Sequence, residues 1–241
     1  MSDRPHHWGV VGTVAWGIAI AVAVTVIQII VVGFYVASAG SGLSKAEVRA
    51  LTEAVQVNGF VLSVATLLTA MLCVPLIFGV VKLKRGSRLV DYMALNAVPM
   101  TTLGKWLGIT ALFLVASDAL STALGRPVVP EFMRSVYSTA DPSFLLWLAL
   151  VVGAPLFEEF FFRGFLFKGL ESAIKPIATI VVTAAIWAAI HLQYDLFDIS
   201  TVFVLGLLLG AARWRTGSIL VPLAMHALAN FVATVEVALL P

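Results

Sequence analysis

Side chains that could activate water lie in the second half of the chain, inside segments that are otherwise strongly apolar. The candidates are two adjacent acids, Glu158 and Glu159, together with His191, His226 and Asn230. A carboxylate can serve as general base toward water, and imidazole or carboxamide donors can stabilise an oxyanion. No serine or cysteine stands out with a base nearby, and a His-Glu-x-x-His pattern is absent. The residue types therefore indicate hydrolysis by an activated water.

The two acids are not equivalent on a helix. Arg163 follows Glu159 by four residues, which puts both on one helical face with the acid first, the favoured order for an ion pair. Arg163 lies five residues after Glu158, about 140° around the helix. The spacing predicts a Glu159–Arg163 salt bridge and leaves Glu158 pointing elsewhere, as a base. The alternative is purely structural, with Glu158 bonded to a neighbouring helix.

The other candidates also have partners at helical spacing. Trp187 precedes His191 by four residues, so we expect the indole to pack against the imidazole. Asn230 follows His226 by four residues, and the two can aim donors at one point, as an oxyanion hole requires. Alternatively, His191 is an interfacial residue at the end of a span, and His226 with Asn230 joins helices through polar contacts.

The composition indicates that these groups belong to a membrane protein. Of 241 residues, 61% are hydrophobic and 12% are charged, against about 25% charged in soluble domains. The net charge of +2 gives no indication of nucleic acid, and the lone Cys73 cannot form an intrachain disulfide. We expect an all-α, polytopic transmembrane bundle of about seven spans, within a range of six to eight. The expected spans are 10–36, 60–81, 103–120, 144–170, 177–191, 199–212 and 219–240.

Charge sets the expected orientation. With a cytoplasmic N-terminus and alternating spans, eleven of the 15 Lys and Arg residues fall inside and four outside, a positive-inside bias. The inside set is Arg4, Lys82, Lys84, Arg85, Arg88, Lys105, Arg163, Lys168, Lys175, Arg213 and Arg215, and the outside set is Lys45, Arg49, Arg126 and Arg134. The stretch 121–143 is expected to be an interfacial helix, a lid or an ordinary loop. We divide the chain into N-terminal helices with a basic cytoplasmic loop (1–142) and a catalytic four-helix core (143–241).

The ordered motifs resemble those of the CPBP family, the membrane-embedded CAAX-protease and bacteriocin-processing enzymes also called the Abi family. The family pattern is Glu-Glu-x-x-x-Arg, then Phe-x-x-x-His, then His-x-x-x-Asn or Asp, on successive helices. Glu158, Glu159 and Arg163 match the first motif, His191 the second, and His226 with Asn230 the third. Trp187 stands where Phe is usual, which keeps an aromatic ring. The resemblance covers about residues 143–235.

The resemblance implies an intramembrane endopeptidase. Carried over, Glu158 and His191 polarise the attacking water, His226 and Asn230 hold the oxyanion, and Glu159 and Arg163 fix the motif helix. The family has been described both as metalloproteases and as metal-free glutamic proteases. We favour catalysis without a cofactor, because Asn230 is a better oxyanion donor than zinc ligand, and zinc held by Glu158, His191 and His226 is the alternative.

Other functions and partners stay open. A proton-coupled transporter could use the same ionisable residues as a relay, and a family member that has lost proteolysis could act as an immunity or scaffold protein. For a protease, the expected partners are membrane lipid and a membrane-anchored substrate, either a prenylated CAAX-type protein or a leader or bacteriocin-type peptide. The short basic loops suggest a prokaryotic plasma membrane. The sequence gives no indication of the oligomeric state.

Overall fold

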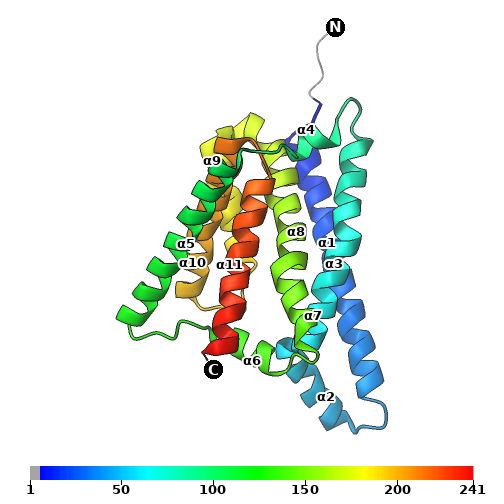
Figure 1. Ribbon diagram of the computed structural model, residues 1–241. Helices are drawn as coiled ribbons and strands as arrows, with labels where there is room; N and C mark the ends of the chain where they lie inside the picture. Colours follow the sequence, from blue (N-terminus) through cyan, green and yellow to red (C-terminus); the bar gives the residue numbers. More distant parts are fainter. Residues whose placement is uncertain (1–5, 241) are drawn as a thin grey trace.

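A computed structural model describes residues 6–240, and throughout this part of the chain the regular elements are helices (Figure 1). Among residues 6–240, six helices are long and apolar enough to cross a membrane, within the range expected from the sequence. They are α1 (Val10–Ala39), α3 (Gly59–Leu83), α5 (Met100–Ala123), the run from α7 to α9 (Ser143–Ala189), α10 (Leu196–Thr216) and α11 (Leu220–Leu239). The connections carry α2 (Lys45–Ala54), η1 (Val55–Val57), α4 (Leu89–Met93) and α6 (Glu131–Ser138).

The expected spans 144–170 and 177–191 are two arms of one bent helical run. The run has 47 residues, about 70 Å of helix, more than twice the thickness of a hydrocarbon core. It contains α7 (Ser143–Leu148), η2 (Ala149–Gly153), α8 (Ala154–Glu159), η3 (Phe160–Leu166) and α9 (Phe167–Ala189), with η2 and η3 in π-helical register. Lys175, just before Pro176, has non-helical angles (φ 64°, ψ 159°), and there the run turns back. Trp187 of the second arm consequently reaches Glu158 of the first.

The two ends of the bundle differ in charge. The basic loop after α3 and the connection from α10 to α11 share one end, because Ile219 N–H donates to Ala94 O at 2.9 Å. The other end holds α2, α6 and the α9–α10 connection (Figure 1). This arrangement keeps the two predicted sets of Lys and Arg apart. Arg4 lies outside the described residues.

Part of the stretch 121–143 forms the short helix α6. Its Val136 is buried, and the hydroxyl of Thr139 ties its end to η1 by donating to Val57 O at 2.7 Å and to α3 by accepting from Gly59 N–H at 2.9 Å. Held in this way, α6 lies over the end of the bundle. It corresponds to the helix that was one of the alternatives expected for residues 121–143.

Two glycines allow α10 to lie close against α9. A Cβ atom at Gly206 would meet Trp187 and Ala184 at 3.0 Å, and one at Gly210 would meet Ile180 at 3.0 Å. Small residues four apart permit such backbone approach between membrane helices. The approach positions α9, and with it Trp187, beside the first arm.

We therefore expect Gly206→Val to destabilise the protein by about 1–3 kcal/mol, the usual cost of overpacking a tight contact. Thermal unfolding in detergent measures the effect. Gly108→Val on α5 is the matched control, because nothing lies within 4 Å of a Cβ there. Equal loss of stability in both variants would contradict the close approach.

Candidate active site

The centre of the site is a buried cluster of Glu159, Arg163 and His226. Oε1 of Glu159 accepts from Nη1 of Arg163 at 2.9 Å, which confirms the predicted pair, and lies 2.8 Å from Nδ1 of His226. The side chains of Glu159 and Arg163 are fully buried and that of His226 is 4% exposed. Because a carboxylate accepts, Nδ1 of His226 carries a proton and Nε2 is the ring atom turned toward Glu158.

Arg163 joins both arms of the bent run to α10. Its Nη2 donates to Gly206 O at 3.2 Å, and its guanidinium lies 4.6 Å from the centroid of the Trp187 ring. Its own carbonyl accepts from Nε of Arg213 at 3.0 Å. A buried guanidinium needs partners that offset its lost hydration. Oε1 of Glu159, the carbonyl of Gly206 and the ring of Trp187 provide them, whereas Nε of Arg163 has no hydrogen-bond partner among the described residues.

Glu158 points away from Arg163, as the helical spacing predicts. Its Oε2 accepts a hydrogen bond from the indole N–H of Trp187, and the side chain remains 19% exposed. Nε2 of His226 lies 4.0 Å from the same Oε2. That distance is too long for a direct hydrogen bond and short enough for one water to contact both atoms.

The indole of Trp187 packs against both imidazoles. Its ring lies 5.2 Å from those of His191 and His226, each in an edge-to-face arrangement, which confirms the predicted contact with His191. Nδ1 of His191 lies 2.7 Å from Trp187 O and must donate to it, since a carbonyl only accepts. Nε2 of His191 is therefore left as the free acceptor.

Asn230 has a partner that the sequence did not suggest. Its Nδ2 donates to Leu150 O at 2.7 Å. In the π-helical register of η2, Ala154 N–H bonds Ala149 O, so the next donor would be residue 155, and Pro155 has no N–H. Asn230 satisfies the carbonyl that this leaves free. An amide nitrogen carries two protons, so a second one remains for another acceptor.

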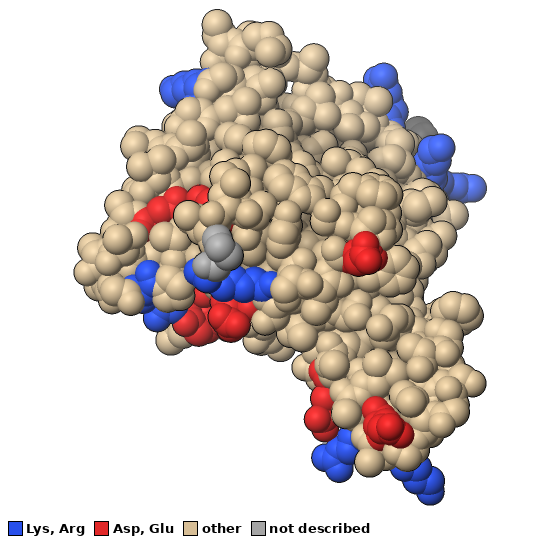
Figure 2. Space-filling model, turned by 60° about the horizontal axis from the view of Figure 1, so that its bottom comes forward, with Lys and Arg blue, Asp and Glu red and all other residues tan. Residues whose placement is uncertain are grey.

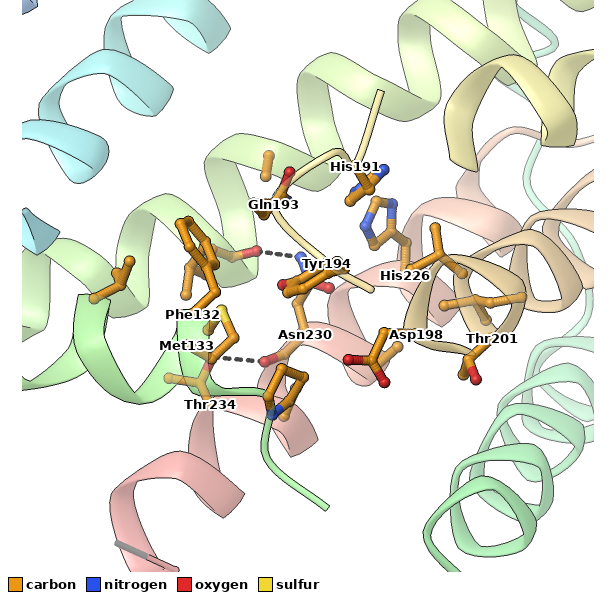
Figure 3. A pocket seen from close by; sticks show the side chains of 18 of the residues that line it. Phe132, Met133, His191, Gln193, Tyr194, Asp198, Thr201, His226, Asn230 and Thr234 are labelled. Carbon is orange, nitrogen blue, oxygen red and sulfur yellow. Dashed lines mark hydrogen bonds between the residues drawn. The ribbon is translucent and has the colours of Figure 1, made fainter. Parts of the chain in front are cut away.

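A cavity of about 680 Å³ joins these groups. Glu158, His191, His226 and Asn230 all line it, whereas Glu159 and Arg163 lie behind its wall. Figure 3 shows the imidazoles of His191 and His226 together, with Phe132 and Met133 of α6 lining another part of the wall.

Several polar lining residues were not among the sequence-based candidates. They include Asp118, Tyr194, Asp198, Thr234 and Glu236. Thr234 could have been found, because it continues the face of α11 that carries His226 and Asn230 at four-residue spacing. Burial raises the pKa of Tyr194 to about 12, so its hydroxyl stays protonated and can donate.

The three residues of the alternative zinc site do not form a ligand set. Among residues 6–240, no group of three or more His, Cys, Asp and Glu side chains is arranged to hold a metal ion. In this arrangement Oε2 of Glu158 accepts from the indole N–H of Trp187.

Replacing Arg163 with Met should destabilise the protein by about 3–5 kcal/mol, because a buried carboxylate would lose its counter-charge. The double variant Arg163→Met with Glu159→Gln should recover part of this loss. Chemical denaturation in mild detergent provides the measurement. Arg49→Met, which breaks an exposed pair with Glu53, is the control and should change almost nothing. A similar small effect at Arg163 would show that the cluster does not stabilise the fold.

The part of the chain that carries this site is similar to known proteins. Residues 140–232 match the family model described as type II CAAX prenyl endopeptidase Rce1-like. An uncharacterized 24.3 kDa protein of Escherichia coli is 30% identical over 126 residues, which cover 50% of this chain and 58% of that relative. The match thus spans little more than half the length of the relative. No solved structure matches the chain.

Proposed function

Because residues 140–232 belong to the Rce1-like type II CAAX prenyl endopeptidase family, we propose that this integral membrane protein hydrolyses a peptide bond within the bilayer. The observation that carries the proposal is the 4.0 Å separation of Glu158 Oε2 and His226 Nε2 at the wall of the cavity. A water there would contact a carboxylate and an imidazole whose far nitrogen is fixed by Glu159.

Glu158 is the general base in this mechanism. Its carboxylate takes a proton from the water while the water oxygen bonds the peptide carbonyl carbon, which gives a tetrahedral oxyanion. Glu158 then delivers that proton to the leaving nitrogen as the C–N bond breaks, so that the carboxylate is regenerated. The hydrogen bond from Trp187 orients Glu158, and the free Nε2 of His191 can accept from the water.

His226 and Asn230 stabilise the oxyanion. His226, with Nδ1 held by Glu159, would donate from Nε2 when its ring carries a second proton, and Asn230 would donate its second amide proton. Both residues come from α11, one helical turn apart. Their fixed partners on the first arm support preorganised donors, which avoid the cost of reorientation during the reaction.

The proposed substrate is a peptide or protein anchored in membrane lipid. A CAAX-type prenylated protein or a leader or bacteriocin-type peptide both suit a cavity between spans, and we treat both as candidates. A proton relay would also use ionisable groups on separate spans. The paired donors of His226 and Asn230 favour the peptidase over a relay, which has no need of an amide beside an imidazole. A non-proteolytic immunity or scaffold protein is the other alternative.

Replacing Glu158 with Gln should lower peptide cleavage by about 100-fold or more, because the amide cannot accept the proton but still accepts from Trp187. The assay follows cleavage of a lipidated peptide by the purified protein in lipid nanodiscs. Glu171→Gln is the matched control, since Glu171 pairs with Lys168 and does not line the cavity. Equal cleavage by wild type and Glu158→Gln would refute the mechanism.

A strong zinc chelator should leave cleavage unchanged, because the site residues do not form a ligand set. The same nanodisc assay, with and without prolonged chelator treatment, provides the test. Inactivation that added zinc reverses would instead favour the metal-dependent alternative.

A further inference from the structure

The cavity extends from the site, where Glu158 of α8 and His226 of the second turn of α11 line it, toward one end of the bundle. Most of the rest of its lining comes from the second half of α5, the last turns of α11, the first turns of α3 and α10, α6, and the α9–α10 connection. In Figure 1 these segments gather at the end where α6 and the C-terminus lie, opposite α4. Figure 2 brings this end forward and shows acidic side chains on it beside a few basic ones.

The Asp, Glu, Lys and Arg side chains that line the cavity are all acidic. Its lining includes four acidic residues, Asp118, Glu158, Asp198 and Glu236, and none of its described lining residues is Lys or Arg. The nearby Arg126 is already paired, since it donates to Asp195 and stacks over the ring of Phe197 at 4.5 Å. The pKa of Asp195 is lowered by the backbone N–H of Asp198 and by Arg126, so that pair stays ionised.

The buried imidazole of His226 also faces this acidic cavity. His226 is 3% exposed, and its Nε2 makes no hydrogen bond to another described residue while Nδ1 is held by Glu159. Carboxylates between spans are costly without a counter-charge, and such groups normally mark a site where a ligand or ion enters. A substrate that carries positive charge would supply what the cavity walls lack.

The basic residues at the opposite end of the bundle indicate how the protein is oriented in the membrane. The basic loop with Lys82, Lys84, Arg85 and Arg88 precedes α5, and Arg213 and Arg215 end α10 at the same side. Loops rich in Lys and Arg stay in the cytoplasm. The cavity, at the other end, would then open away from the cytoplasm.

We propose that the cavity receives a positively charged segment of a membrane-anchored peptide, presented at the membrane face opposite the basic loops. The proposal rests on the proposed peptidase function and narrows its substrate class. It disfavours a prenylated C-terminus displayed in the cytoplasm for two reasons. Such a C-terminus would lie on the other side of the membrane from the cavity opening, and its terminal carboxylate would meet four acidic side chains. Asp118 and Glu236 are the residues that select the cation, since they line the cavity from α5 and α11 without a role in the mechanism.

Cysteine labelling tests on which side of the membrane the cavity opens. In a Cys73→Ser background, single cysteines replace Leu192, 81% exposed on the α9–α10 connection, or Ala97 on the α4–α5 connection. A membrane-impermeant maleimide added outside spheroplasts should label Leu192→Cys and should label Ala97→Cys only after lysis. The reverse pattern would overturn the proposal, and neither result depends on proteolysis.

Peptide binding tests the charge. Glu158→Gln protein in nanodiscs of neutral lipid is titrated with a palmitoylated Lys-rich peptide and with the same peptide carrying Glu at each Lys. The Lys-rich peptide should bind on the order of tenfold more tightly at low salt. Asp118→Asn with Glu236→Gln should remove most of that preference, whereas Asp91→Asn, exposed near the basic loop, should not.

Equal binding of the two peptides, or an unchanged preference in the double variant, would overturn the proposal. If labelling and binding come out as expected and wild type cleaves neither peptide, the peptidase function fails while the cation site stands.

Discussion

The structure depends on one buried carboxylate, Glu159, shared between a guanidinium and an imidazole. A buried carboxylate needs donors or a counter-charge, and Oε1 of Glu159 has both, from Arg163 on the same helical run and from His226 on α11. This single group therefore fixes the distance between two spans. It also fixes which nitrogen of His226 faces Glu158, so the electrostatics of the fold and the geometry of the site have the same origin.

The backbone is adapted to this cluster at several points. Gly206 lets α10 approach closely enough for its carbonyl to accept from Arg163. The π-helical η2, followed by Pro155, leaves a carbonyl for Asn230. Departures from α-helical register are common at functional sites because they free backbone groups for other partners. Here the freed carbonyl orients the amide proposed to donate to the oxyanion.

Local spacing predicted the contacts that one helix determines. The Glu159–Arg163 pair, the separate direction of Glu158 and the packing of Trp187 on His191 all follow from 3.6 residues per turn. The all-helical membrane fold followed from composition. Contacts between helices were beyond such reasoning, including Glu159 with His226, Asn230 with Leu150, and the turn at Lys175 that lets Trp187 reach Glu158. They depend on the rotation and depth of each span, which hydropathy does not specify.

In the proposed mechanism, one water sits between Glu158 and His226. An experimental structure in lipid, at a resolution that shows ordered solvent, tests it most directly. We expect a water within hydrogen-bonding distance of Glu158 Oε2 and His226 Nε2, with His226 Nδ1 still on Glu159. A direct hydrogen bond between Glu158 and His226, or an apolar side chain filling the space between them, would contradict it.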